Sequence, residues 1–549
     1  MRPPASKGAE AAGDTSLSGG GTASFCEANR AVWQEFLGGR CEGKGHSVLV
    51  DGLNTYPGGL MEIGVTSAAL KKLTGLKTVW VTRPYAGKGA LDVMRSYCAD
   101  RIEMLSVRRF PLAFVMSLVK SVFIFLSTRA ENLLALKYKG AVIGDLIYDT
   151  YLRDTGNGTV SRKDPYLYRK IVEAVFFYDI HEKLIKKHSV KHIIVGHAAV
   201  YNVYGTMIRA AREAGLTVYF AGCDGKTPGN FTIRKFKPED EPVYYRKVIK
   251  EMFDDVYKNN PDTARRVIEE YFEARMSGNV TRDPNVTIAF KTGKRFYTRE
   301  GLAGLMKIDI NKPFVYMMAH VFPDAPHDQR WYLFNDHYDW SRETIKRMGG
   351  IKDVNWILKE HPLNRHSFYH SKVRLDTIVR EIYGDSLPGH IVFLPDDVST
   401  KSVLDSADGV VTARGTIGLE AAYLGIKCLL AGDAVYSGLG FTFDPETKEE
   451  YFRLLSTLFR KDNTQTVDAG MAKVAAFVYF IHTLVQPGII PEMEGFSMQR
   501  GSEAEDKAYA DAASLLRERH VSEDYGINRI LDYFKSGRVQ MTNSFEIYK

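Results

Sequence analysis

The sequence contains few cysteines and lacks the familiar signatures of several enzyme classes. Its 549 residues include five cysteines, which are scattered and show no Cys-x-x-Cys spacing. This pattern argues against a disulfide framework and against a zinc site, and it favours a reducing compartment. No Walker loop, Gly-x-Gly-x-x-Gly fingerprint or His-Glu-x-x-His motif is present, and no metal-chelating Asp-x-Asp follows an apolar run. We therefore expect chemistry that needs neither a metal ion nor a bound cofactor.

A strong charge imbalance and a secretion signal are also missing. The formal net charge is +7, which suits anionic small molecules or an acidic membrane surface but does not by itself indicate nucleic-acid binding. Residues 1–24, MRPPASKGAEAAGDTSLSGGGTAS, have no apolar core of the kind that a signal peptide needs. We interpret them as a disordered tail and expect the protein in the cytoplasm.

One apolar run approaches the length of a membrane span. Residues 108–129, RRFPLAFVMSLVKSVFIFLSTR, are flanked by arginines and interrupted by Lys120. A spanning helix needs about 20 apolar residues, and a lysine near its centre costs roughly 2.5–3.5 kcal/mol, so a true span is the weakest of three interpretations. The other two are a buried helix and an interfacial helix that lies on the bilayer with its arginines at the headgroups. The interfacial helix predicts peripheral contact with the inner face of the membrane.

The order of the apolar runs predicts an α/β protein with two doubly wound, Rossmann-like domains that face each other across a cleft. Runs such as SVLVDGL and KTVWVT alternate with helical stretches in the first half, and the alternation restarts at KPFVYMMAHVF. Strands that are apolar along their whole length are typical of parallel sheets covered on both faces. The predicted divisions are a disordered tail (1–24), an N-terminal Rossmann-like domain (25–235), a helical connector (236–305), a C-terminal Rossmann-like domain (306–465) and C-terminal helices (466–549).

Unusual polar clusters follow three of the expected strands in the second half. In open α/β sheets, ligands bind beyond the carboxyl ends of the strands, where loops and helix N-termini meet. We therefore expect the clusters to line one crevice. In chain order they are His320 after FVYMMA, Glu360-His361-Pro362 after VNWILK, and Arg414-Gly415-Thr416 after GVVTA.

The residue types in the second cluster suit a phosphate-bearing ligand. Pro362 cannot donate to a β ladder and favours an extended conformation in the residue before it, which holds His361 at the strand end. Lys359 can meet a phosphate as a point charge. Taken alone, the same run is equally explained by a proline that ends a strand beside solvated charges.

The stretch ARGTIGLEAAYLG, residues 413–425, is more specific. Gly415 and Gly418 allow a ligand close to the backbone. Thr416 can cap the helix that follows, and the N–H groups at a helix N-terminus suit a phosphate. Glu420 lies one residue too far from Thr416 for a capping box, so we expect it to contact ribose hydroxyls.

Candidates for a general base in the N-terminal half carry a weaker signal. A base of this kind accepts the proton of a hydroxyl group at the cleft, but each candidate is also explained as a structural polar residue near a strand end. We predict the base among His197, Asp145 and Asp224. The stretch GDLIYDTYLR also contains Asp149 and Arg153 close to Asp145. The same two explanations apply to Asp51 in VDGLN.

These motifs, in this order, make the sequence similar to a known family. The succession HVF, WILKEHP, VVTARGTIGLEAAYLGIKCLLAG and GLGFT resembles the nucleotide-binding half of GT-B glycosyltransferases. More narrowly, it resembles the bacterial capsule and surface-polysaccharide transferases, including the Kdo-transferase-like group. The resemblance covers residues 310–445 well and the N-terminal half only in its general layout. One departure is Arg414, which stands where small hydroxyl residues are common in the group, and which indicates either a phosphate clamp or a different donor.

The resemblance implies a glycosyltransferase. With the missing Asp-x-Asp and the apolar run 108–129, we expect it to be metal-independent, cytoplasmic and membrane-associated. Its donor would be a nucleotide-sugar and its acceptor a bacterial surface or capsular polysaccharide or a glycolipid, with no cofactor and no nucleic acid. Three alternatives stay open: a CDP-glycerol-type polyol-phosphate transferase, a sugar-nucleotide 2-epimerase, and a non-catalytic subunit of a polysaccharide assembly complex. The residues expected to hold the donor are His320, Lys359, His361, Pro362, Arg414, Thr416, Gly418 and Glu420.

Overall fold

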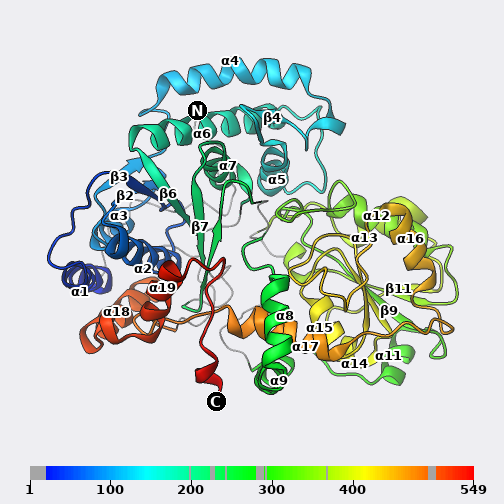
Figure 1. The fold of residues 1–549 in the computed structure, drawn as a ribbon. Helices are drawn as coiled ribbons and strands as arrows, with labels where there is room; N and C mark the ends of the chain where they lie inside the picture. Colours follow the sequence, from blue (N-terminus) through cyan, green and yellow to red (C-terminus); the bar gives the residue numbers. More distant parts are fainter. Residues whose placement is uncertain are drawn as a thin grey trace. The chain divides into compact units, whose positions relative to one another are not determined.

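The protein contains two compact units, each built around its own sheet. Unit 1 falls within Met1–Thr150, Ser161–Tyr245 and His482–Ser544, and unit 2 within Tyr151–Val160, Arg246–Ile481 and Phe545–Lys549. The structure is a computed structural model, drawn in Figure 1, which describes residues 20–196, 199–222, 229–240, 244–279, 290, 293–365, 369–492 and 503–549.

The sheet of unit 1 is doubly wound. Its six strands have the order β3-β2-β1-β6-β7-β8, and all neighbouring pairs are parallel except the last. Every residue of β1 is buried, which explains why its central residues Val48-Leu49-Val50 are all apolar. The strands are β1 (Ser47–Asp51), β2 (Lys77–Thr82), β3 (Arg101–Met104), β6 (Val190–Val195), β7 (Thr217–Gly222) and β8 (Thr232–Phe236).

Helices cover both faces of this sheet (Figure 1). On one face, one apolar core joins α1 (Gly20–Phe36), α2 (Pro57–Thr74), α3 (Lys88–Ser96), α18 (Glu503–Glu518) and α19 (Tyr525–Ser536). The other face is covered by α6 (Tyr166–Lys187) and α7 (Thr206–Glu213), with α5 (Gly144–Thr155) beside them. A short hairpin of β4 (Lys137–Tyr138) and β5 (Ala141–Val142) precedes α5.

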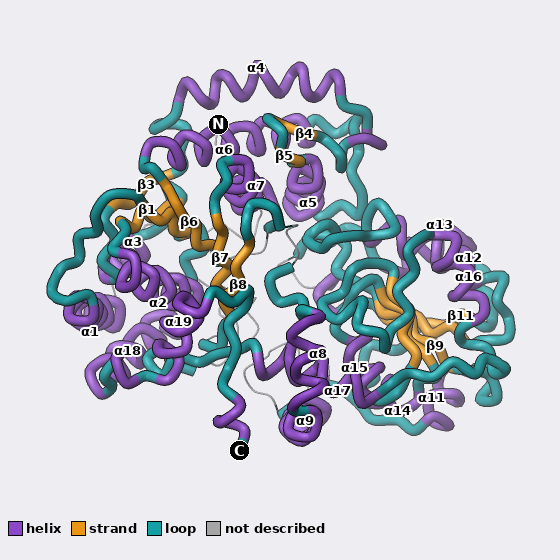
Figure 2. Tube along the Cα trace, viewed as in Figure 1, coloured by secondary structure: helices purple, strands orange, loops and turns teal. Residues whose placement is uncertain are grey.

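The sheet of unit 2 is entirely parallel, with the order β11-β10-β9-β12-β13. Figure 2 shows its strands in orange around β9 and β11, with helices about them. The chain starts at the central strand, moves outward on one side, and returns to the other side at β12. This is the strand order of a Rossmann-like domain, with a topological switch point between β9 and β12. The strands are β9 (Phe314–Met318), β10 (Asn355–Lys359), β11 (Ile391–Phe393), β12 (Gly409–Thr412) and β13 (Lys427–Leu430).

Successive strand residues of unit 2 feed two apolar cores, one on each face. Trp356 and Leu358 of β10 pack with α12 (His337–Met348), α13 (Leu375–Tyr383) and α16 (Lys448–Thr457). Ile357 faces the other way, toward α11 (Arg299–Met306) and α14 (Thr400–Ser406). Beside β12, α15 (Ile417–Tyr423) packs on α17 (Ala469–Phe477), which in turn packs on α8 (Lys250–Asn259) and α9 (Pro261–Met276).

The prediction of two Rossmann-like α/β domains is confirmed, but the predicted boundaries need correction. Helix α1 begins at Gly20, inside the stretch 1–24 that was predicted to be a tail. Helices α8, α9 and α11 of the predicted connector count with unit 2. The stretch 466–549 is not one helical block: α17 lies in unit 2, whereas α18 and α19 complete the core of unit 1. Local sequence cannot show this exchange, since it depends on which core buries each helix.

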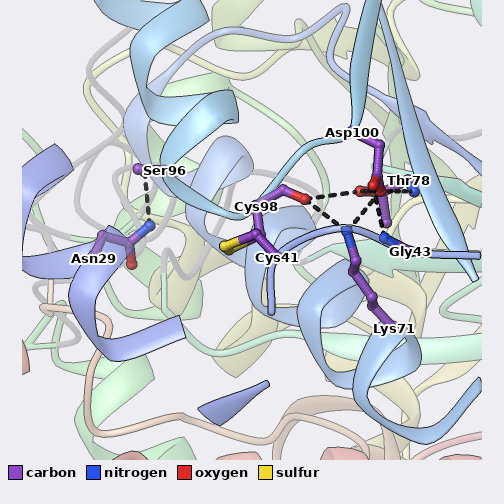
Figure 3. The surroundings of a disulfide bond; sticks show 8 residues. All are labelled: Asn29, Cys41, Gly43, Lys71, Thr78, Ser96, Cys98 and Asp100. Carbon is purple, nitrogen blue, oxygen red and sulfur yellow. Dashed lines mark hydrogen bonds and ion pairs between the residues drawn. A yellow bond between two sulfur atoms is a disulfide. The ribbon is translucent and has the colours of Figure 1, made fainter. Parts of the chain in front are cut away.

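Two of the cysteines are paired, against the expectation from their spacing. Cys41 and Cys98 form a disulfide across 57 residues of sequence. Close to it, the Asp100 carboxylate accepts hydrogen bonds from Gly43 N (2.8 Å), Thr78 N (2.7 Å) and Lys71 Nζ (2.6 Å), as Figure 3 shows. The network joins the segment before β1, the last turn of α2, the start of β2 and the segment before β3. The disulfide therefore links parts of the chain that the sheet already brings together.

The apolar run 108–129 forms α4 (Pro111–Ser127) on the surface of unit 1, where it packs along α6 (Figure 1). The interpretation as a buried helix is wrong, because the buried residues of α4 are Ser117 and Ser121. The helices that the structure describes include none long and apolar enough to cross a membrane.

Candidate functional site

The switch point of the unit 2 sheet brings two of the predicted clusters into direct contact. His320 follows β9, and Arg414 follows β12. The backbone N–H of Arg414 donates to Nε2 of His320 at 3.2 Å. Because Nε2 accepts this bond, a neutral His320 carries its proton on Nδ1.

A second histidine, His337, stacks on the His320 ring. The rings of His320 and His337 stack with their centroids 4.6 Å apart. Burial lowers the pKa of His337 to about 3, so this ring is neutral at physiological pH. Its Nδ1 pairs with the Tyr332 hydroxyl at 2.8 Å. The stack therefore fixes the orientation of His320 without adding charge.

Asn364 links the ends of β9 and β10. Its Nδ2 donates to the backbone oxygen of His320 (2.9 Å) and to Oε1 of Glu360 (2.6 Å), and its Oδ1 accepts from Phe322 N (3.0 Å). All three strand ends, of β9, β10 and β12, are thus connected by hydrogen bonds through His320. The predicted convergence of the three clusters is present in the structure.

Glu360 has a structural task in this turn. Its carboxylate accepts from His361 N (3.0 Å) and from Leu375 N (2.7 Å) at the start of α13. A carboxylate at a helix N-terminus satisfies an N–H that has no partner within the helix. The turn that carries His361 is thereby anchored to α13.

His361 and Pro362 lie where the sequence predicts, at the carboxyl end of β10. Pro362 opens a 3-10 turn, Pro362–Arg365. Within it, Leu363 N donates to His361 Nδ1 at 3.2 Å. A neutral His361 therefore carries its proton on Nε2, which makes that nitrogen a hydrogen-bond donor.

Lys359 is the cation of the site whose pKa is shifted furthest from its ordinary value. Its Nζ donates to Thr400 Oγ1, at the start of α14, at 3.0 Å. Burial, with a smaller effect from the nearby charge of Lys294, lowers the pKa of Lys359 to about 7, although Glu420 and Asp396 act in the opposite direction. A lysine at the carboxyl end of a parallel strand whose pKa is lowered this far is a functional-site candidate.

The Arg414 side chain is held by the loop that follows β9. One guanidinium nitrogen donates to the Ala325 oxygen at 2.6 Å, and another forms an ion pair with Asp328. The charge of Arg414 is thus balanced within unit 2. Its role as a phosphate clamp, or as the mark of a different donor, stays a prediction.

The two small residues at the start of α15 differ from what the sequence suggested. Thr416 is the N-cap residue, yet among the described contacts its side chain makes no capping hydrogen bond. Gly418 faces the interior: a Cβ there would lie 2.1 Å from the Tyr436 hydroxyl and 2.7 Å from Cys428 Sγ. The glycine is required for packing of the helix, and its contact with a ligand stays a prediction.

Glu420 is buried in an ion pair with α9. Its Oε1 accepts from Nε (3.0 Å) and Nη2 (2.7 Å) of Arg275, whose guanidinium lies 4.8 Å from the Phe480 ring centroid. Both side chains are less than a tenth exposed. The predicted contact with ribose hydroxyls is untested, and any such contact would share a carboxylate that already has this partner.

The candidate bases of unit 1 are placed in part. His197 and Asp224 lie outside the described residues. Asp145, at the start of α5, receives a hydrogen bond from Arg209 of α7 at 2.6 Å. Asp51 is fully buried at the end of β1 and accepts from Leu53 N (2.8 Å) and Gly196 N (3.2 Å), so it joins β1 to β6 at their switch point.

Sequence reasoning missed Arg83, which follows β2 at the same edge of the unit 1 sheet. Its guanidinium donates to the Tyr85 hydroxyl and lies 5.6 Å from the ring centroid of Tyr204. Tyr204 belongs to a π-helical turn, Tyr201–Gly205, which Tyr201 enters with a φ of 58°. Such strained turns are frequent at functional sites. The signal was available, since Arg83 directly follows the apolar run KTVWVT.

Comparison with known proteins adds one informative match. Residues 351–481, from β10 to the end of α17, match the model of the family described as capsule polysaccharide biosynthesis protein. The protein resembles the capsule-synthesis family. The resemblance predicted from the KEHP and ARGTIGLE motifs is confirmed, since both lie inside the matched segment. No curated protein matches the chain at a significant level.

Solved structures are similar only at a distance. The Thermosulfurimonas dismutans KpsC β-Kdo 2,4-transferase is 12% identical, with 59% of this chain and 87% of that chain covered and a TM-score of 0.34. For the Neisseria meningitidis UDP-GlcNAc 2-epimerase bound to UDP-GlcNAc the identity is 9%, the coverage 79% and 98%, and the TM-score 0.25. A Rickettsia africae glycosyltransferase is 10% identical, with 92% of this chain and 98% of that chain covered and a TM-score of 0.22. At these TM-scores the likenesses carry no argument.

Proposed function

We propose that the protein is a glycosyltransferase of capsular or surface-polysaccharide synthesis, with the GT-B arrangement, that uses a nucleotide-sugar donor. The observation that carries the proposal is the convergence of His320, His361 and Arg414 at the switch point of unit 2. Two of them, His361 and Arg414, lie within the segment that matches the capsule-synthesis family. Ligands of open α/β sheets bind at this position.

In the proposed reaction, a hydroxyl group of the acceptor attacks the anomeric carbon of the donor sugar. The bond between that carbon and the nucleotide's phosphate oxygen breaks, and the phosphate leaves with the bonding electrons. Protonated Lys359 and the Nε2–H of His361 would stabilise the charge that develops on the leaving oxygen. A base in unit 1 would take the hydroxyl proton. The candidates remain His197, Asp145 and Asp224.

The acceptor is proposed to be a glycan or glycolipid of the bacterial surface, bound at the carboxyl edge of the unit 1 sheet. Arg83 and Tyr204 support this placement, because an aromatic ring stacks on sugar faces and a guanidinium pairs with carboxylate or phosphate groups.

The proposal also includes a cytoplasmic location with peripheral contact of residues 108–129 at the inner membrane face, and chemistry without a metal ion.

The test is nucleotide release from a panel of UDP-, GDP-, CMP- and CDP-linked donors, each with and without a crude glycolipid acceptor and with and without EDTA. Release that requires the acceptor and resists EDTA supports the proposal. Interconversion of a UDP-sugar without acceptor would instead identify a 2-epimerase, and release of CMP from CDP-glycerol a polyol-phosphate transferase. Absence of nucleotide binding in calorimetry would identify a non-catalytic subunit.

Two variants connect the activity to the site. His361→Ala should weaken donor binding or turnover about 10- to 100-fold, the value of one hydrogen bond to a charged group. His520→Ala is the matched control, because His520 is an exposed histidine of unit 1. Equal activity of the two variants would contradict the assignment of the donor site.

A further inference from the structure

Helix α4 buries its polar side chains and exposes its apolar ones. Ser117 and Ser121 are 0% exposed, whereas Leu112, Phe123 and Leu126 are 73%, 70% and 69% exposed. A helix on the surface of a soluble protein normally shows the opposite arrangement. An exposed apolar face of this kind marks a surface that binds a partner or a membrane.

Hydrogen bonds on the inner side hold the helix in this orientation. Lys120 Nζ donates to Asp179 (2.7 Å) on α6 and to the Tyr138 hydroxyl (2.8 Å). The Tyr168 hydroxyl donates to the Leu118 oxygen at 3.0 Å. Rotating α4 to bury its apolar face would break these contacts, so the exposure is built into the packing of unit 1.

The charge around α4 indicates what covers it. The segment Leu105–Ala130 contains three arginines and one lysine and no Asp or Glu. Arg108 and Arg129 are exposed, one before and one after the helix. A second copy docked on the same face by two-fold symmetry would bring these arginines toward those of its partner. An anionic lipid surface matches both the apolar face and its basic ends.

We propose that α4 docks the protein on an anionic bilayer, lying parallel to the surface. Its apolar side chains enter the boundary between headgroups and acyl chains, and Arg108 and Arg129 contact the headgroups. At 17 residues the helix is about 25 Å long. The docking deepens the membrane contact of the proposed function and rests on that function only for the identity of a lipid-linked acceptor.

Flotation of the full chain with vesicles tests the docking without any turnover. We expect the wild type to float with vesicles of phosphatidylcholine containing about 30% phosphatidylglycerol, and much less with phosphatidylcholine alone. In the double variant Phe123→Ser, Leu126→Ser, the partition coefficient onto anionic vesicles should fall at least about tenfold. Both side chains would otherwise be buried in the interface. Arg108→Gln, Arg129→Gln should lose most of the preference for anionic vesicles.

The controls separate docking from misfolding and from self-association. Phe296→Ser removes a 61% exposed phenylalanine of unit 2 and should float like the wild type. Residues 123 and 126 are mostly solvated, so the double variant should keep the wild-type melting temperature. Wild type that stays at the bottom with anionic vesicles, or a double variant that floats equally, overturns the inference. A wild-type dimer that the double variant converts to monomers, with no flotation of either, would assign α4 to self-association. A docked protein that transfers no sugar would leave the inference standing and contradict the proposed function.

Discussion

Lys359 offers a direct test of the electrostatics of the donor site. Burial lowers its pKa from the ordinary 10.5 to about 7, which corresponds to a penalty of at most about 5 kcal/mol on the protonated form. The side chain is partly exposed, so screening by water reduces this figure. Lys359→Met removes the charge and also the hydrogen bond to Thr400, whose loss costs about 1 kcal/mol.

The sign of the effect follows from proton linkage. Below pH 7 the lysine is protonated in both the folded and the unfolded chain, so the full penalty is present. Between pH 7 and 10.5 only the unfolded chain holds the proton, and the stability of the wild type should rise by up to about 1.4 kcal/mol per pH unit. Lys359→Met should therefore be more stable than the wild type at about pH 6, and this advantage should disappear toward about pH 10.

The assay is urea unfolding of both proteins between about pH 6 and pH 10. The difference between them reports on unit 2, where the substitution lies, and cancels all groups that titrate equally in both. Lys401→Met is the matched control, because the Lys401 side chain of α14 is 43% exposed and pairs with Asp405. A stability difference between wild type and Lys359→Met that does not change with pH would refute the reasoning.

Three further predictions concern the same unit. Glu420→Gln leaves the buried Arg275 guanidinium without its carboxylate, and should cost about 3–5 kcal/mol in urea unfolding; a loss well below this would mean that the pair is not desolvated. Gly418→Ala places a methyl group 2.1 Å from the Tyr436 hydroxyl and should cost about 1–3 kcal/mol, whereas Gly304→Ala, with no described atom within 4 Å, should be neutral or stabilise α11. If the donor phosphate requires the protonated lysine, affinity should fall up to about tenfold per pH unit above pH 7, and calorimetry in buffers of different ionisation enthalpy should show proton uptake at about pH 8.

Much of the fold could be predicted because parallel strands leave a simple signal. β1, β9, β10 and β12 are buried on both faces, so the central residues of each strand form a short continuous apolar run. The edge strand β3 was missed. Its sequence RIEM is only four residues long and buries the charged Glu103, whereas Ile102 and Met104 are half-buried, so no apolar face marks it as a strand.

The partners of the site residues could not be predicted, because they are distant in sequence. Glu420 was correctly separated from a capping box, but its partner Arg275 lies 145 residues away. Arg414 follows β12, whereas its ion-pair partner Asp328 lies in the loop that follows β9. The orientation of α4 had a readable signal, since Ser117, Lys120 and Ser121 share one helical face by their spacing. Hydropathy alone did not show that this face is the inner one.

The ion pairs of the charged site residues in unit 2 indicate which charge would contribute most to binding the donor phosphate. Arg414 is paired with Asp328 and Glu420 with Arg275, so a phosphate that approaches either ion pair must compete with a charge already in place. Lys359 differs, because the hydrogen bond that the described residues provide is to the neutral Thr400 hydroxyl. A cation that burial destabilises gains more from an incoming anion than one already compensated. Lys359 is therefore the residue at which donor binding and protonation should be coupled most strongly.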